Sequence, residues 1–243
     1  YYPAWLAYAC GYSAERGHKS ALIDCIADKL DHDISVKRVS DLKPRLVVIG
    51  TSTPSIAADI KFASEIKKAS PGTLFCLVGT HASAEAEEIV KSNPHIDFVA
   101  RREYDKTIFE VVTALKSDSS WHGIKGITFF VDGVVQNNPM MPYIHDLDEV
   151  PFASKVYKEH LNIRNYYYGH VRYPMISIFT SRGCDARCAF CIYPQTMFGN
   201  FRERSPKNIA EEFIWIRENL PEIQEILIDD DTFTMNSEHA RRV

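Results

Sequence analysis

Three cysteines lie within eight positions of one another in the stretch SRGCDARCAFCIYPQT: Cys184, Cys188 and Cys191. A disulfide would pair two of them and leave the third unused. Structural zinc sites close their coordination with four ligands, and no fourth Cys or His lies at the short paired spacing such sites use. A 4Fe-4S cluster normally takes four thiolates, so three leave one iron open to a substrate or cofactor. The spacing favours such a cluster over zinc or a chance arrangement.

The segments on either side of the cysteines predict the elements that position them. Before the cysteines, PMISIFTSRGC has the apolar run of a strand that leads directly into the cysteine loop. After them, Ser205 provides a helix cap and Pro206 suits the first helical position, and a second strand-like run, EILIDDDTF, follows the helix. This order implies parallel strands, with the cysteines at the carboxyl end of the first, where barrel enzymes keep their catalytic groups.

An acidic run, Asp229, Asp230 and Asp231, ends the second of these strands. Three adjacent carboxylates buried at a strand end repel one another unless cations or hydrogen-bond donors meet them. The run therefore indicates either a site for a cationic or donor-rich ligand or a solvated turn, and both interpretations stay open.

The first 117 residues alternate between short apolar runs and segments with helical spacing. The predicted strands are SALIDC, LVVIGTSTP, TLFCLVGTH and IDFVARRE. Between the second and third, SIAADIKFASEIKKAS places Ile56, Ala63 and Ile66 on one face, as expected of a helix that covers a sheet. Strands buried on both faces and separated by helices predict an α/β fold: a doubly wound, Rossmann-like parallel sheet over residues 1–117.

The opening segment from Pro3 to Gly17 predicts a helix that Gly17 ends. Its inward-facing residues are predicted to be Trp5, Leu6, Ala9 and Tyr12. No strand precedes this helix, although a doubly wound domain ordinarily begins with one. We therefore expect either that a first strand is missing or that this numbering begins inside a longer protein.

Small and hydroxylated residues follow two of the predicted strands. Ligands of doubly wound sheets bind at the carboxyl ends of the strands, near a switch in strand order. Ser52 and Thr53 come after one strand, and Gly79 and Thr80 come after the next, so a large ligand can approach the backbone there. Ordinary turn chemistry explains the same residues equally well, and the loops alone do not decide between the two.

The pattern changes between residues 118 and 170. GITFFVDGVVQNN carries two strand-like runs around Asp132-Gly133, a dipeptide that favours a tight hairpin turn. MMPYIHDLDEVPF has no sustained period and predicts an extended linker. NYYYGHVRY is aromatic enough to line a pocket, although tyrosines beside a linker more often pack against two domains.

Length and composition bound the remaining interpretations. At 243 residues with 45% hydrophobic content, the chain can bury the core of one large domain or two ordinary ones. A net charge of −4 and the lack of a basic, aromatic-interleaved cluster argue against a nucleic-acid partner. No apolar run approaches the roughly 20 residues that span a bilayer, and no signal peptide opens the chain, so we expect a cytoplasmic protein. The other three cysteines are each isolated in an apolar setting, so we expect them to be small buried hydrophobic residues without a chemical role: Cys10, Cys25 and Cys76.

The C-x3-C-x2-C spacing, with Phe190 just before the last cysteine, is the signature of radical S-adenosylmethionine (SAM) enzymes. Along its whole length the chain resembles the cobalamin-binding (class B) members of that superfamily. Within the class it most resembles the hopanoid-biosynthesis associated proteins, which are related to the anaerobic porphyrin cyclases. The blocks that carry this narrower resemblance are WLAYACGY, TSTPSIAADI, IDFVARREYD, RERSP and IDDDTFT.

The resemblance implies three cofactors and their sites. Cys184, Cys188 and Cys191 would hold a 4Fe-4S cluster whose open iron binds SAM, and reductive cleavage of SAM would yield a 5′-deoxyadenosyl radical. Phe190 would lie near the adenine, and Asp229, Asp230 and Asp231 near the amino or ribose groups of SAM. Cobalamin would lie against Ser52, Thr53, Gly79 and Thr80. No residue is assigned as a catalytic acid or base.

Two departures from the family pattern qualify these expectations. The sequence holds only the first two strands of a barrel, so residues 171–243 are expected to be the N-terminal part of a truncated barrel. The motif Asp-x-His-x-x-Gly, which supplies a lower axial His to cobalt in other cobalamin domains, is also missing. Its expected place holds Pro3, Ala4, Trp5 and Leu6. Either cobalamin binds without a protein imidazole or the domain has lost this cofactor, and we expect the first.

The implied activity is rearrangement, cyclisation or methylation of a hopanoid lipid or its sugar-derived head group, with flavodoxin or ferredoxin as reductant and room for peripheral membrane contact. Because a radical reacts only with groups held within a few ångströms, the loops after Gly50 and Gly79 are expected to face Cys184 across one active site. The alternative from another class is a non-catalytic iron-sulfur or zinc module on an α/β scaffold.

Overall fold

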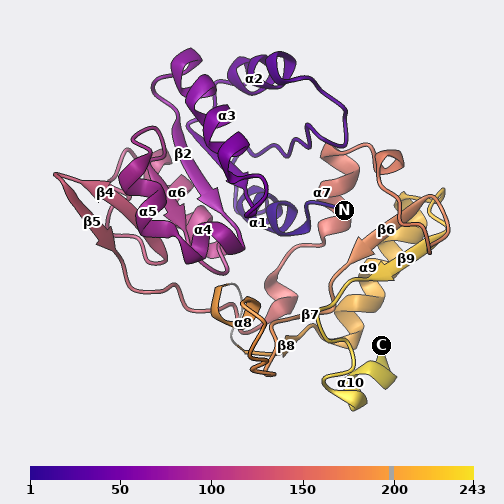
Figure 1. The fold of residues 1–243 in the computed structure, drawn as a ribbon. Helices are drawn as coiled ribbons and strands as arrows, with labels where there is room; N and C mark the ends of the chain where they lie inside the picture. The colour runs from indigo at the N-terminus through magenta and orange to yellow at the C-terminus, as the bar shows by residue number, and fades with distance from the viewer. Residues whose placement is uncertain (197–199) are drawn as a thin grey trace. The chain divides into compact units, whose positions relative to one another are not determined.

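The computed structural model describes residues 1–196 and 200–243, which form two compact units (Figure 1). The first, here called the sheet unit, consists chiefly of residues 29–143. The second, here called the cysteine-loop unit, joins residues 1–28 and 144–194 with the described residues from 200 onward. This division differs from the linear boundaries expected at residues 117 and 170, because the first 28 residues pack with the C-terminal half of the chain.

The sheet unit contains a five-stranded mixed sheet with the order β1-β2-β3-β4-β5. The strands β1, β2 and β3 are parallel, whereas β4 and β5 form a hairpin that joins β3 antiparallel. The order is consecutive, so these strands lack the reversal that defines a doubly wound sheet, and that part of the prediction is wrong. The strands are β1 (Leu46–Gly50), β2 (Leu74–Val78), β3 (Phe98–Ala100), β4 (Ile127–Val131) and β5 (Val134–Asn137).

Local sequence explains most elements of this unit. Asp132 and Gly133 have φ angles of 50° and 79°, the positive values that favoured two-residue hairpin turns need, so the predicted hairpin is confirmed. The predicted cover helix is α3 (Ile56–Ala69), which buries Ala63 and Ile66. The other helices are α2 (His32–Asp41), α4 (Thr80–Ala84), α5 (Ala86–Ser92) and α6 (Asp105–Lys116).

The segment SALIDC, predicted to be a strand, has no regular secondary structure and leads into a turn. The Asp24 carboxylate accepts a hydrogen bond from the Ala27 amide (2.9 Å), and it also accepts one from the Tyr166 hydroxyl (2.8 Å). A short acidic side chain that bonds to nearby backbone competes with strand formation, and here the turn prevails. The sheet therefore lacks the additional strand that the sequence pattern suggested.

The cysteine-loop unit is built on two parallel strands, β6 (Met175–Ile178) and β9 (Glu225–Ile228). They are linked through α9 (Pro206–Asn219), whose Ser205 cap accepts a hydrogen bond from the Asn208 amide (3.1 Å). The predicted strand, helix, strand unit is confirmed. Shorter elements are β7 (Ser181–Arg182), β8 (Arg202–Glu203) and α10 (Ser237–Arg242), and the short helix α8 (Tyr193–Thr196) is divided between the two units.

The predicted opening helix is α1 (Ala4–Ala14), and it packs against a helix that the sequence did not predict, α7 (Ala153–His160). A Cβ on Gly11 would lie 2.9 Å from Val156 Cγ2, so this glycine permits the close approach of the two helices. Two short 3-10 helices, η1 (Leu147–Glu149) and η2 (Ile163–Asn165), flank α7. The expected extended linker is therefore partly helical, because α7 is too short for its apolar period to stand out.

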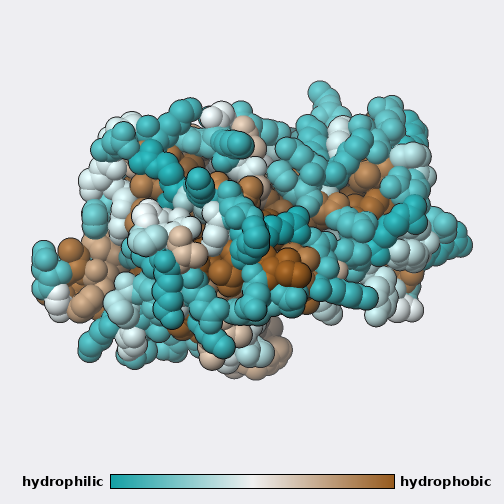
Figure 2. Space-filling model, turned by 90° about the horizontal axis from the view of Figure 1, so that it is seen from above, coloured by the Kyte–Doolittle hydropathy of each residue, from teal (hydrophilic) through white to brown (hydrophobic). Residues whose placement is uncertain are grey.

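On the face drawn in Figure 2, polar and charged residues cover most of the surface and apolar residues appear in patches between them. Scattered exposed apolar side chains are usual for proteins in water. Among the residues that the structure describes, no helix has both the length and the apolar character needed to cross a membrane.

Candidate functional site

The cysteine loop leaves the end of β6 and is closed at its base by the antiparallel pair β7 and β8. Gly183 has φ +87°, and a Cβ there would lie 2.1 Å from the Asn200 carbonyl oxygen, so only glycine fits without a backbone shift. The Phe201 amide also donates a hydrogen bond to the Asp185 carboxylate (3.1 Å). Both ends of the loop are thereby held together, while the cysteines lie beyond this base.

The three cysteines of the motif are free thiols on this loop. Cys188 is exposed, and Cys184 and Cys191 are half-buried. The Cys191 amide donates to the Cys188 carbonyl (3.1 Å), so a tight turn spans the last spacing of the motif. Within residues 1–196 and 200–243, no three His, Cys, Asp or Glu side chains form a group arranged to hold a metal ion. Three thiolates are a suitable donor set for a 4Fe-4S cluster with one open iron. Binding of such a cluster by these cysteines is a proposal.

Phe190, between the second and third cysteines, is 93% exposed. An aromatic ring with so little contact to its own chain contributes little to the fold. Its position near an adenine ring therefore stays a prediction. The exposed ring is free of any large packing role that would prevent such a contact.

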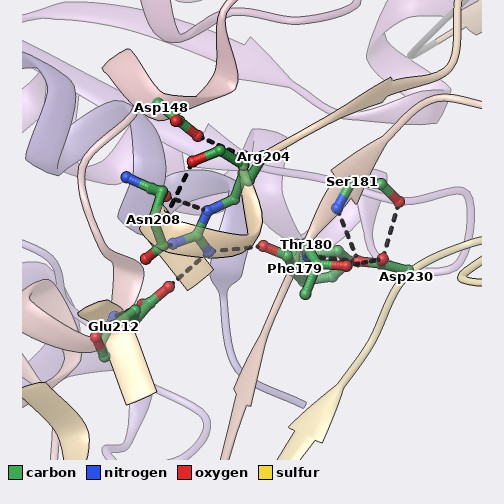
Figure 3. Close-up of polar contacts among 10 residues, drawn as sticks. Asp148, Phe179, Thr180, Ser181, Arg204, Asn208, Glu212 and Asp230 are labelled. Atoms are coloured by element: carbon green, nitrogen blue, oxygen red, sulfur yellow. Dashed lines mark hydrogen bonds and ion pairs between the residues drawn. The ribbon is translucent and has the colours of Figure 1, made fainter. Parts of the chain in front are cut away.

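The acidic run at the end of β9 divides into two kinds of carboxylate. Both oxygens of Asp230 accept hydrogen bonds from the start of the cysteine loop (Figure 3). Burial raises the pKa of Asp229, and repulsion from Asp230 adds to this effect. Asp231 as a residue is exposed, yet burial of its carboxyl group, followed by repulsion from its two neighbours, raises its pKa to about 6. Donors meet both oxygens of the central carboxylate, and Asp231 has a side-chain hydrogen bond with Tyr193.

Behind the loop lies a buried ion pair that the sequence analysis did not identify. The Arg204 guanidinium donates to Glu212 (2.6 Å) and to the Phe179 carbonyl (2.9 Å), as Figure 3 shows. Glu212 also accepts a hydrogen bond from the Ser154 hydroxyl (2.7 Å). The side chains of Arg204 and Glu212 are only 6% and 0% exposed. The pair fastens β6, α7 and α9 to one another, so part of the RERSP block is structural.

Arg182 connects the base of the loop to α1. Its guanidinium lies over the rings of Tyr8 (4.7 Å) and Trp5 (5.2 Å), and the residue is buried. The small cavity beside it holds about 10 Å³, enough for roughly one water and too little for a substrate. Its lining residues are Tyr8, Leu147, Val150, Phe179, Ser181, Arg182 and Arg204. These contacts form a support for the loop and not a substrate pocket.

The sheet unit brings together the predicted loops at the carboxyl ends of β1 and β2. The Thr53 hydroxyl and His81 Nδ1 are 3.1 Å apart and share a hydrogen bond. Gly79 has φ +113°, and a Cβ there would lie 2.4 Å from the Thr51 carbonyl oxygen. Ser52 and Thr53 are exposed at this edge. Gly79 is therefore required by the protein's own backbone, and His81 lies beside the predicted residue Thr53 without having been predicted as a ligand contact itself.

Three comparisons of sequence place the chain among known proteins. Residues 1–112 match the family model of the B12 binding domain. An uncharacterized methyltransferase of Pyrococcus horikoshii is 31% identical over 239 residues, which cover 98% of this chain and 50% of the relative. The anaerobic magnesium-protoporphyrin IX monomethyl ester cyclase of Cereibacter sphaeroides is 27% identical over 217 residues, covering 86% of this chain and 34% of the cyclase.

Solved structures resemble the fold. The radical S-adenosylmethionine methyltransferase TsrM of Kitasatospora setae, with cobalamin and a [4Fe-4S] cluster bound, has a TM-score of 0.75 at 14% identity and aligns over 98% of this chain and 47% of its own. The cobalamin-dependent radical enzyme OxsB, with aqua-cobalamin and SAM bound, has a TM-score of 0.76 at 17% identity over 99% of this chain and 33% of its own. The chain thus spans half or less of each of these four proteins. It is a relative of methyltransferases and cyclases, with the fold of cobalamin-dependent radical SAM enzymes.

Proposed function

We propose that the protein is a radical SAM enzyme of the cobalamin-binding class. The observation that carries the proposal is the set of three disulfide-free cysteines on one loop at the carboxyl end of β6. The match of residues 1–112 to the B12 binding domain supports the second half of the proposal. When bound, the 4Fe-4S cluster supplies the electron that cleaves SAM to a 5′-deoxyadenosyl radical.

The residues of the cysteine-loop unit take distinct roles in this proposal. Cys184, Cys188 and Cys191 hold three irons and leave the fourth open to SAM. Asp229 and Asp231, which flank the saturated carboxylate of Asp230, bind the cationic amino group or the ribose hydroxyls of SAM. Burial, and after it repulsion between neighbouring carboxylates, raises the pKa of both groups, and a cation beside them would offset both effects.

Cobalamin occupies the edge of the sheet unit in this proposal. Ser52 and Thr53 offer exposed hydroxyls there, and the backbone at Gly79 and Thr80 is close enough to the surface for a large ligand to contact. The hydrogen bond between Thr53 and His81 holds the two loops in one arrangement.

The proposed reaction is methylation, cyclisation or rearrangement of a hopanoid lipid or its sugar-derived head group, with a flavodoxin or ferredoxin as reductant. The sequence blocks TSTPSIAADI and IDDDTFT support the hopanoid-associated subgroup, and the relatives named as methyltransferase and cyclase support the reaction class. Incubation of the loaded protein with hopanoid precursors, followed by mass spectrometry of the lipid, tests the substrate. An unchanged lipid in an enzyme that cleaves SAM would refute the substrate but not the reaction class.

The proposed function is tested by anaerobic reconstitution with iron and sulfide, followed by SAM and dithionite. We expect about four irons per chain and the formation of 5′-deoxyadenosine. A non-catalytic iron-sulfur or zinc module would bind metal and leave SAM intact, and that outcome would contradict the proposal. Cys25→Ser is the matched control, because this cysteine lies outside the motif in the same unit.

A further inference from the structure

The central carboxylate of the acidic run is saturated with hydrogen bonds from its own chain. Asp230 Oδ1 accepts from the backbone amides of Thr180 (2.7 Å) and Ser181 (3.1 Å). Its Oδ2 accepts from the hydroxyls of the same two residues, at 2.5 Å and 2.9 Å. A carboxylate offers about four lone-pair positions, so these donors occupy all of them.

These four bonds hold the point at which the cysteine loop leaves the barrel strand. Thr180 directly precedes β7, and its carbonyl accepts a hydrogen bond from the Arg204 amide (2.9 Å). Ser181 pairs with Glu203 across the base of the loop. Thr180 and Ser181 are buried, so water competes little for their donors. Cys184 follows only three residues after Ser181.

We propose that Asp230 is a positioning residue for the cluster loop and does not contact SAM. This inference rests on the proposed function and separates Asp230 from its neighbours, which remain the SAM-binding carboxylates. Asp230 acts by fixing the backbone and hydroxyl orientations at residues 180 and 181, which set the direction of the chain toward the first cysteine. Groups that orient a ligand loop in this way typically contribute a factor on the order of 10 to 100 in metal affinity or activity.

Two substitutions separate a positioning role from a ligand role. In Asp230→Asn, the amide oxygen still accepts from both backbone amides, and the amide nitrogen donates to the two hydroxyls, which rotate to accept. Asp230→Ala removes all four hydrogen bonds. A residue that binds the cationic amino group of SAM through its charge would instead be impaired equally by both changes, because each removes the charge.

The experiment compares the wild type, Asp230→Asn, Asp230→Ala and the surface control Glu218→Ala, whose side chain is 63% exposed on α9. Each protein is reconstituted anaerobically, and iron content, the visible spectrum and the affinity for SAM are measured. We expect Asp230→Asn to stay within about twofold of the wild type in all three, and Asp230→Ala to lose cluster affinity on the order of 10- to 100-fold. Full cluster retention in Asp230→Ala overturns the proposal. Weakened SAM binding in both variants with the cluster intact also overturns it.

Hydrogen exchange of the protein without its cluster separates this inference from the proposed function. We expect the amides of Thr180 and Ser181 to exchange faster in Asp230→Ala than in Asp230→Asn or the wild type. Protection that is equal in all three proteins contradicts the inference, whether or not the wild type takes up a cluster. Failure of the wild type to load iron contradicts the proposed function alone.

If Asp230→Ala does not fold, Thr180→Val and Ser181→Ala each remove one hydroxyl donor and keep the carboxylate. We expect each to lower cluster retention by a smaller factor than the loss of all four bonds. Iron content unchanged in both variants would overturn the proposal.

Discussion

The cysteine loop and the edge of the sheet unit both lie at the carboxyl ends of parallel strands, but different groups hold them. At the base of the cysteine loop, buried side chains from distant segments determine the geometry, as Asp230 and the Arg204–Glu212 pair do. At the sheet edge, the backbone itself determines it, through the contact between Gly79 and the Thr51 carbonyl. Exposed hydroxyls then line the surface of that edge.

This difference corresponds to what each of the two proposed ligands needs. A metal cluster requires a few thiolates at fixed positions, so the loop that carries them benefits from a rigid base and an accessible middle. A large cofactor requires space along the backbone, which small residues and a left-handed glycine provide. The following predictions test whether the two regions respond to substitution as differently as their structures indicate.

The largest effect is expected from Cys188→Ala. Two thiolates are too few to retain the cluster, so both bound iron and SAM cleavage should be lost. Iron content and the brown absorbance of the reconstituted protein provide the measurement, with Cys25→Ser as the matched control. Full iron content in the variant would refute the assignment of the cluster to this loop.

The next effect concerns the buried pair behind the cysteine loop. Glu212→Ala leaves the Arg204 guanidinium buried without its partner, which should lower the free energy of unfolding by about 3–5 kcal/mol. Urea denaturation measures this change. Glu211→Ala, one residue away on α9 with a 51% exposed side chain, should cost less than about 1 kcal/mol. Equal costs for the two variants would contradict the role of the pair as a fastening of the loop.

At the sheet edge, substitution of Gly79 should affect mainly the stability of the unit, whereas substitution of Thr53 should affect mainly cobalamin binding. A side chain at Gly79 collides with the Thr51 carbonyl, so Gly79→Ala should destabilise the unit by about 1–3 kcal/mol. Thr53→Trp loses only an exposed hydrogen bond, at a cost of about 1 kcal/mol or less, yet its bulk should block cobalamin. Thermal unfolding and cobalamin retention distinguish the two cases. Cobalamin retention unchanged in Thr53→Trp would count against this edge as the site.

The smallest effect is expected from the titration of Asp231. Burial, followed by repulsion from its neighbours, raises the folded-state pKa of Asp231 to about 6, so ionisation of this carboxyl opposes folding. The contribution of the carboxyl to folding stability is present in full below the ordinary pKa of an aspartate. It is lost as the pH rises through about 6. Asp231→Asn should therefore stabilise the protein at about pH 8, by roughly 0.2–1 kcal/mol for so exposed a residue, and by less at about pH 5. Urea denaturation at both pH values checks the sign, and a larger gain at the lower pH would contradict it.

Features that depend on neighbouring residues could be predicted before the fold was known. The cysteine spacing identified the candidate metal loop, Ser205 and Pro206 marked the start of α9, and Asp132-Gly133 marked the hairpin turn. Each of these rests on the preference of a few adjacent residues for one backbone conformation or one ligand. Such preferences are present in the unfolded chain, so they can be recognised before any tertiary contact is known.

Contacts between residues that are far apart in the chain could be recognised only in the folded protein. Asp230 bonds to Thr180 and Ser181 across about 50 residues of sequence, and nothing in the run of three aspartates distinguishes the central one. Tertiary contacts also place α1 in the cysteine-loop unit, and SALIDC forms no strand of the sheet. Long-range contacts depend on how whole helices and strands pack against one another. The residue pattern of a segment does not say which distant segment it contacts, so the side chains that support the cysteine loop could be identified only from the three-dimensional structure.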